Sequence, residues 1–114
     1  MRERPRDKAR LKHILEACDI ITDAVKKFGF EAIQAEPIML HGLVKQIEII
    51  GEAVYMLSKE FKEQNPVAPW QQIEDMRHIL VHDYYRINYS TLRVVVEKDL
   101  AELIPKIQDL YDKE

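Results

Sequence analysis

The sequence predicts an all-α fold, an antiparallel up-and-down bundle of four main helices in one domain over residues 1–114. Three observations support this prediction. Apolar residues recur at spacings of three and four along most of the chain, the period of an amphipathic helix. Gly29, Pro37 and a proline-containing loop at residues 65–69 separate these repeats. No alternating strand pattern of useful length appears in the sequence.

The first helix is expected over residues 7–28, with Asp7 as its N-cap and Gly29 at its end. Residues 1–6 are expected to be a frayed, basic N-terminus. Cys18 is the only cysteine, which excludes an internal disulfide, and its place on the apolar stripe predicts a packing role. That stripe contains Leu11, Ile14, Cys18, Ile21, Val25 and Phe28.

The second helix is expected over residues 38–61, opened by Pro37, and it is apolar on two sides. A helix of this kind is sandwiched between neighbours or meets a partner chain. Gly42 and Gly51 each cost about 1 kcal/mol of helix propensity against alanine, and close helix–helix approach would offset that cost. One stripe contains Leu40, Leu43, Val44, Ile47, Ile50, Val54, Leu57 and Phe61, and the other contains Met39, Gly42, Gln46, Ile49, Ala53 and Met56.

The third helix is expected over residues 70–84, with Trp70 as a core or loop anchor. The last helix is expected to begin at a cap on Ser90 or Thr91. Pro105 lies inside its apolar stripe, which predicts a kink or break at that residue. The stripe contains Leu92, Val96, Leu100, Leu103, Ile107 and Leu110.

The charge pattern argues against a general nucleic-acid binder, because the net charge is −3. Residues 1–12 carry +4, so the rest of the chain carries −7. The basic segment is interpreted as a solvated arm, or alternatively as an arm beside a phosphate site. No apolar run has the length of a membrane span, and the charged N-terminus lacks the pattern of a signal peptide. A cytoplasmic location without membrane contact is therefore expected.

The side chains best suited to catalysis or ligand binding are concentrated in residues 77–84, which contain an arginine, two histidines and a tyrosine. If this segment is helical, His78 and His82 are four residues apart and share one face with Asp75. Such a face suits a site formed against a second surface. Because the chain is too short for a second domain, a second copy is the expected partner. The opposite, apolar face contains Ile73, Met76 and Leu80.

One interpretation of this segment is acid–base cleavage of RNA. A histidine can take and give a proton near neutrality, and the forked guanidinium of Arg77 matches a phosphate. RNA supplies its own nucleophile, the 2′-hydroxyl, so a base and a cation suffice without a metal. On a helix, Arg77 and His82 would point about 140° apart. Two copies meeting across a twofold axis would bring both groups to one cleft, which predicts a homodimer.

Two other interpretations remain open from the spacing alone. His78 and His82 have the spacing of metal ligands on a helix, with Asp75 beside them and His41 or a second chain completing the set. Alternatively, these polar residues only hold a pair of helices together. An arginine followed by a histidine five to seven residues later is a common accidental match in a chain with seven arginines.

The chain as a whole resembles the minimal HEPN family, and within it the HepT-like toxins of HepT–MntA modules. The family pattern of Arg, four residues, His, one residue and Tyr occurs as Arg77-His-Ile-Leu-Val-His82-Asp-Tyr84. The similarity spans nearly all of residues 6–110. Other resembling segments are RLKHILEA at 10–17, EIIGEA at 48–53, LSKEF at 57–61 and PWQQI at 69–73.

The resemblance implies a homodimeric, metal-independent endoribonuclease toxin that needs no cofactor, cuts RNA in a cleft at the dimer interface and forms part of a toxin–antitoxin system. Carried over by position, Arg77 would stabilise charge on the scissile phosphate and His82 would be the acid/base. His78 stands where the family usually has a polar residue and would be accessory. Tyr84 would accept AMP from an MntA-like nucleotidyltransferase, with Tyr85 as the neighbouring alternative. The added phosphate would bring bulk and negative charge beside Arg77 and exclude RNA.

Two non-enzymatic hypotheses compete with this one. In the first, the chain is a helical partner or substrate subunit of a nucleotidyltransferase, and Arg77 and His82 serve recognition. In the second, it is a dimerising helical module without further chemistry.

Overall fold

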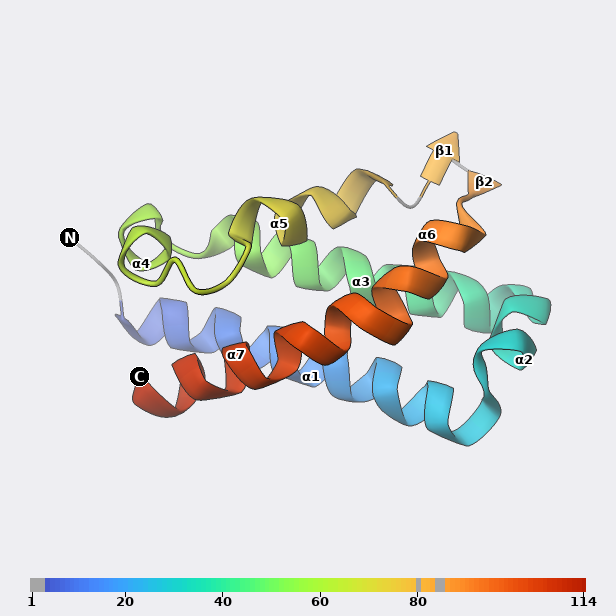
Figure 1. Ribbon diagram of the computed structural model, residues 1–114, viewed down its shortest axis with the longest axis horizontal. Coiled ribbons are helices and arrows are strands. Elements are labelled where there is room, and N and C mark those ends of the chain that lie inside the picture. Colours follow the sequence, from blue (N-terminus) through green and yellow to red (C-terminus); the bar gives the residue numbers. More distant parts are fainter. Residues whose placement is uncertain (1–3, 80, 84–85) are drawn as a thin grey trace.

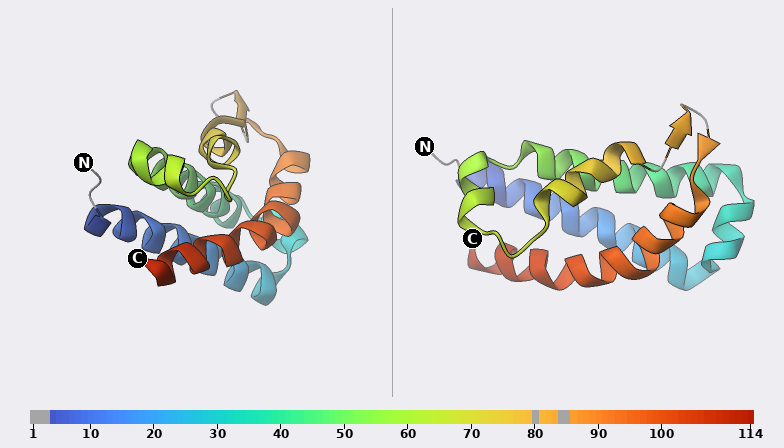
Figure 2. Two further views of the ribbon diagram at one scale, coloured as in Figure 1. Left: turned by 60° about the vertical axis from the view of Figure 1, so that its left-hand side comes forward. Right: turned by 45° about the horizontal axis from the view of Figure 1, so that its top comes forward.

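The fold is an elongated helical bundle, seen in a computed structural model that describes residues 4–79, 81–83 and 86–114 (Figure 1). Its extents are 45 × 29 × 20 Å. Four helices, α1, α3, α5 and α7, run up and down along the long axis in alternating directions (Figures 1 and 2). α1 packs against both α3 and α7, and α5 packs on α3. The prediction of an all-α up-and-down bundle is therefore confirmed.

The helices are joined by shorter elements. α1, α3, α5 and α7 span Arg4–Phe28, Pro37–Met56, Trp70–Ile79 and Leu100–Lys113. The short helices α2, α4 and α6 span Phe30–Ala35, Lys59–Gln64 and Tyr89–Val94, and the π-helical segment η1 spans Val95–Asp99. Two short strands, β1 at Val81–Asp83 and β2 at Arg86–Ile87, pair in antiparallel fashion. No helix in the described ranges combines the length and the apolar character needed to cross a membrane.

The core is built from the apolar stripes of α1, α3 and α7, whose innermost side chains are fully buried. Trp70 is an anchor, as predicted: its ring packs 5.9 Å from that of Phe61 and its Nε1 donates to the carbonyl of Asn65 at 2.8 Å. Cys18 is completely buried, and burial raises the pKa of its thiol to about 12. The predicted stripe of α1 was too long, because Phe28 is half exposed. The innermost residues include Leu11, Ile14, Ile47, Ile50, Val54, Phe61 and Ile107.

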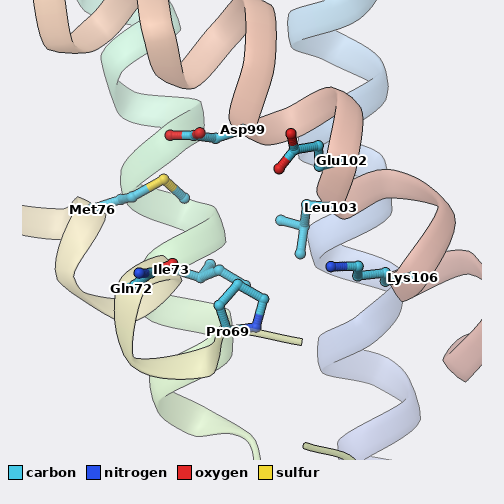
Figure 3. A pocket seen from close by; sticks show the side chains of 8 residues that line it. All are labelled: Pro69, Gln72, Ile73, Met76, Asp99, Glu102, Leu103 and Lys106. Atoms are coloured by element: carbon cyan, nitrogen blue, oxygen red, sulfur yellow. The ribbon is translucent and has the colours of Figure 1, made fainter. Parts of the chain in front are cut away.

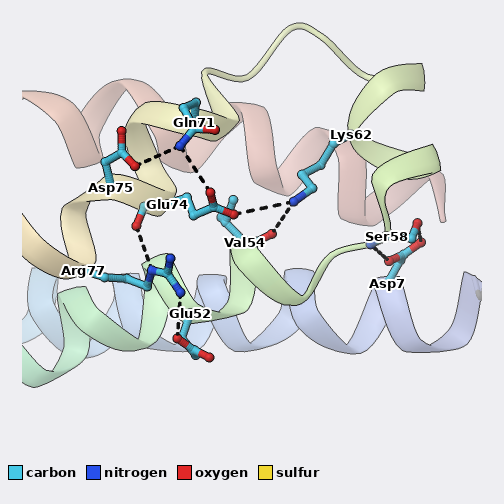
Figure 4. Close-up of polar contacts among 9 residues, drawn as sticks. All are labelled: Asp7, Glu52, Val54, Ser58, Lys62, Gln71, Glu74, Asp75 and Arg77. Carbon is cyan, nitrogen blue, oxygen red and sulfur yellow. Dashed lines mark hydrogen bonds and ion pairs between the residues drawn. The ribbon is translucent and has the colours of Figure 1, made fainter.

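The predicted helix over residues 38–61 is confirmed as far as Met56 but is too long, because the chain turns at Ser58 and begins α4. The Ser58 hydroxyl accepts from the backbone N–H of Phe61 at 3.1 Å and so caps α4. Asp7 was predicted to cap its own helix. Its carboxylate instead accepts from the N–H and the hydroxyl of Ser58, each at 2.8 Å (Figure 4). α1 begins earlier, at Arg4. The buried Asp7 therefore holds the α3–α4 corner to α1.

The predicted helix over residues 70–84 is also too long, because α5 ends at Ile79 and β1 follows. β1 pairs with β2 through Val81 opposite Ile87 and Asp83 opposite Arg86. Both residues of the first pair are β-branched, a residue type that favours strands over helices. His82 therefore lies on a strand, and the helical numbering used for the segment does not extend to it.

The C-terminal segment is one continuous run of helix with a change of pitch. Asn88 caps it in place of Ser90 or Thr91, since its side chain accepts from the Thr91 N–H at 3.1 Å. α7 continues through Pro105 without a break. The proline faces solvent, so water can satisfy the carbonyl that loses its N–H donor. The irregularity lies upstream in η1, where the Leu100 N–H bonds the Val95 carbonyl five residues back.

Candidate active site

Arg77 lies near the end of α5, and its side chain lies back against α3. Its Nε donates to the carbonyl of Glu74 at 3.1 Å, and its Nη1 donates to the Glu52 carboxylate at 3.3 Å (Figure 4). The guanidinium carbon stands 4.5 Å from the ring centroid of Tyr55, within cation–π range. The side chain is 22% exposed, so the guanidinium is held but still reaches solvent.

The absence of a side chain at Gly51 makes this placement possible. A Cβ there would lie 2.5 Å from Cγ of Arg77 and 3.2 Å from the carbonyl oxygens of Ile73 and Glu74. α5 therefore crosses α3 at Gly51 at a distance that only glycine permits. This confirms that close helix approach accounts for Gly51. Close helix approach within the chain does not account for Gly42, because a Cβ there would meet no atom within 4 Å.

A polar network holds the first turns of α5 to the rest of the bundle. The Lys62 ammonium lies 3.8 Å from the Glu74 carboxylate and donates to the Val54 carbonyl at 3.2 Å. Gln71 bridges Glu74 and Asp75, at 3.3 and 2.9 Å (Figure 4). Because Glu74 also supplies the carbonyl bonded by Arg77, the network fixes the turn that carries the arginine.

The other predicted site residues are only partly described. The backbone of His78 lies in α5 and that of His82 in β1, while their side chains and all of Tyr84 and Tyr85 lie outside the described part of the structure. The prediction that His78, His82 and Asp75 share one helical face is wrong, because α5 ends between the two histidines. The helical metal-ligand spacing and the 140° argument for two copies therefore lose their geometric basis.

Sequence analysis missed Glu52 and Tyr55, the neighbours of Arg77 on α3. Both are more than half exposed, at 60% for the Glu52 side chain and 53% for Tyr55, so no burial pattern marks them. The available signal was their spacing, because Gly51, Glu52 and Tyr55 lie on one helical surface around a glycine. Such a surface could have been identified as the place where a side chain from another helix lies against α3.

A cavity of about 360 Å³ opens between α5 and the C-terminal helical run (Figure 3). Apolar side chains form its floor, and polar groups from both helices stand at its mouth. It does not include Arg77 and is separate from the candidate site. Its lining residues are Pro69, Gln72, Ile73, Met76, Asp99, Glu102, Leu103 and Lys106.

Comparisons with known proteins match a span that includes the motif segment. The family described as "Ribonuclease HepT-like" matches residues 14–110, a span that contains Arg77, His82 and Tyr84. A protein of Caldanaerobacter subterraneus subsp. tengcongensis, provisionally named an RNase, is 36% identical over 104 residues, which cover 91% of this chain and 93% of the relative.

Two archaeal relatives extend the similarity. A provisionally named RNase of Methanocaldococcus jannaschii is 31% identical, covering 89% of this chain and 93% of the relative. A protein of Thermococcus cleftensis, provisionally named ribonuclease HepT, is 29% identical, covering 88% and 91%. No solved structure gives a significant match. The family match covers most of the chain, and the chain therefore belongs to the HepT-like ribonuclease family.

Proposed function

We propose that this protein is a metal-independent endoribonuclease that acts as the toxin of a toxin–antitoxin system. The family match and the names of the relatives support RNA cleavage. The structural observation that carries the proposal is the held guanidinium of Arg77. Arginine has five N–H donors, and the described contacts of Arg77 engage one on Nε and one on Nη1. The remaining donors suit a phosphate, which arginine binds in a forked, two-bond geometry.

The proposed reaction uses the RNA's own 2′-hydroxyl. The imidazole of His82 takes the 2′-OH proton, the 2′-oxygen forms a bond to phosphorus, and the P–O5′ bond breaks as the 5′-oxygen receives a proton. The products are a 2′,3′-cyclic phosphate and a 5′-hydroxyl end. Arg77 stabilises the charge that accumulates on the phosphorane oxygens. His78, or His82 of a second copy, would supply the proton to the leaving oxygen.

The proposal includes a homodimer with its cleft beside Arg77. An outward face of α3 supports it: Ile38 is 82% exposed, Met56 is 43% exposed, and Ile49 lies half-buried between them. These three residues fall on one stripe of the helix, and the same helix carries Glu52 and Tyr55. Exposed apolar side chains on one side of a helix, here interspersed with Lys45 and Glu52, support a surface that a second copy covers.

The proposal also includes control by a partner protein. An MntA-like nucleotidyltransferase would transfer AMP to the hydroxyl of Tyr84, with Tyr85 as the alternative acceptor. The added phosphate would compete for Arg77 and exclude RNA from the cleft. The whole system would operate in the cytoplasm, where RNA, the nucleotidyltransferase and its ATP are together.

The test is cleavage of RNA by the purified protein in the presence of EDTA. Wild type should cut RNA and leave cyclic phosphate ends, and both Arg77→Ala and His82→Ala should reduce the rate by at least about 100-fold. His13→Ala is the matched control, because His13 is exposed on α1. Equal rates for wild type and His82→Ala, or loss of cutting in EDTA, would overturn the mechanism.

A non-enzymatic role is the second candidate, and one observation favours it. The guanidinium of Arg77 contacts the carboxylate of Glu52, an acidic neighbour that opposes binding of an RNA backbone. In that case the surface would bind a protein partner. The same cleavage assay separates the two candidates, because this role predicts no RNA cutting by wild type.

A further inference from the structure

We propose that Glu52 and Tyr55 are positioning residues that fix the guanidinium of Arg77 in one orientation. The orientation is a property of the fold; its consequence for RNA cleavage rests on the proposed function. The proposal adds two residues of α3 that are absent from the arginine–histidine–tyrosine motif. They act through Arg77, and neither needs to touch the scissile phosphate.

Three contacts from three directions define the orientation. The Glu74 carbonyl accepts from Nε and fixes the near edge of the guanidinium. The ring of Tyr55, 4.5 Å from the guanidinium carbon, fixes its plane. The Glu52 carboxylate, 3.3 Å from Nη1, fixes its rotation within that plane. A free arginine side chain populates many rotamers, so holding it before substrate arrives removes part of the cost of binding a phosphate in a defined pose.

The bundle does not need these two contacts for its stability. The Glu52 side chain is 60% exposed, and exposed ion pairs contribute little to stability. Tyr55 is 53% exposed and lies outside the buried core. By contrast, the missing side chain at Gly51 leaves the space that Cγ of Arg77 occupies. The geometry is therefore better explained as placement of one side chain than as reinforcement of the fold.

The charge of Glu52 gives the proposal a distinctive kinetic signature. A carboxylate beside the phosphate site disfavours RNA binding, whereas a fixed guanidinium favours the transition state. Glu52→Gln should therefore lower kcat without raising KM. A residue that only helped to bind RNA, or only stabilised the fold, would not produce this split. Misplacement of a catalytic group by about 1 Å costs up to about 100-fold in rate, so a decrease of about 10-fold in kcat is expected.

The experiment follows Arg77 directly and independently of RNA. In ¹H–¹⁵N spectra, a held guanidinium gives resolved Nε and Nη signals, and a free one gives averaged signals. Arg77→Lys identifies the signals by their loss. Glu52→Gln and Tyr55→Leu should both average the Arg77 signals, whereas Tyr55→Phe should keep them because it retains the ring. Glu48→Gln is the matched control, because Glu48 lies one turn earlier on α3 and stands 4.0 Å from Lys45.

The two proposals fail in different ways. If the Arg77 signals are unchanged in Glu52→Gln and Tyr55→Leu, the positioning proposal is overturned whatever the activity. If Glu52→Gln cuts RNA as fast as wild type or faster, Glu52 only competes with phosphate and the proposal is again overturned. If wild type does not cut RNA but the two variants release Arg77, positioning is supported and the ribonuclease mechanism fails.

Discussion

Cγ of Arg77 occupies the space in which a side chain at Gly51 would begin, 2.5 Å from an ideal Cβ. Gly51→Ala should therefore displace Arg77, and we expect RNA cleavage to decrease by about 10- to 100-fold. Stability should fall by about 1 kcal/mol or more, because crowding against two backbone carbonyls exceeds the gain in helix propensity. Cleavage rates and urea unfolding measure the two effects.

Gly42→Ala is the matched control on the same helix. A Cβ at Gly42 would meet nothing within 4 Å in the protomer, so this variant should gain up to about 1 kcal/mol of stability and leave Arg77 in its place. If Gly51→Ala behaves in the same way as Gly42→Ala, the close crossing of α3 and α5 does not determine where Arg77 lies.

Met56→Lys tests the proposed homodimer. Met56 is 43% exposed on the outward stripe of α3, so a lysine there should leave the protomer folded while it opposes burial against a second copy. We expect the mass in solution to change from dimer to monomer and RNA cleavage to be lost. Light scattering and circular dichroism measure assembly and fold. Val67→Lys, at a 59% exposed loop position, should change neither.

Asp7→Ala should be the most destabilising exchange of a charged residue on α1. The carboxylate is 1% exposed and accepts two bonds of 2.8 Å from Ser58. Its removal leaves the partly buried N–H and hydroxyl of Ser58 without their acceptor, which costs about 2–3 kcal/mol. Chemical denaturation measures this loss. Asp23→Ala, an exposed position on the same helix, should change stability by less than about 0.5 kcal/mol; equal losses would refute the contact.

Cys18 should make stability depend on alkaline pH. Burial raises its thiol pKa from the ordinary 9.0 to about 12, so the folded state keeps the proton that the unfolded state releases. The stabilising effect is complete below pH 9 and is lost as the pH rises toward 12. Denaturation from pH 8 to 11 should show this decline in wild type and a weaker one in Cys18→Ala. An alkylating reagent should modify Cys18 only when the protein unfolds.

The helices that pack through one face were predicted from the sequence because their period is local. The run from Leu11 to Ile21 and the run from Leu100 to Leu110 both bury the residues that the spacing selected. The position of Trp70 was also predicted from local sequence, since a large aromatic side chain beside a loop is usually buried against the core.

Features that depend on contacts between distant residues were not predictable from the sequence. The end of α3 depends on the contact from Asp7 to Ser58, 51 residues away. The end of α5 coincides with strand pairing to Ile87. The contact of Arg77 with Glu52 spans 25 residues. A periodic pattern shows which face of a helix is apolar. It does not show which residues from distant parts of the chain contact that helix.

The π-helical turn also explains why one position of the last stripe was misplaced by one residue. The stripe was predicted through Val96, but Val95 is the buried residue, and the next buried position is Leu100, five residues on. That spacing is the period of the π-turn itself. The turn therefore acts as a single-residue insertion in an α-helix, and the helix continues on either side of it. A homologue one residue shorter here would close an ordinary α-turn and keep both flanking stripes facing inward, so this segment is where length variation should be tolerated during evolution.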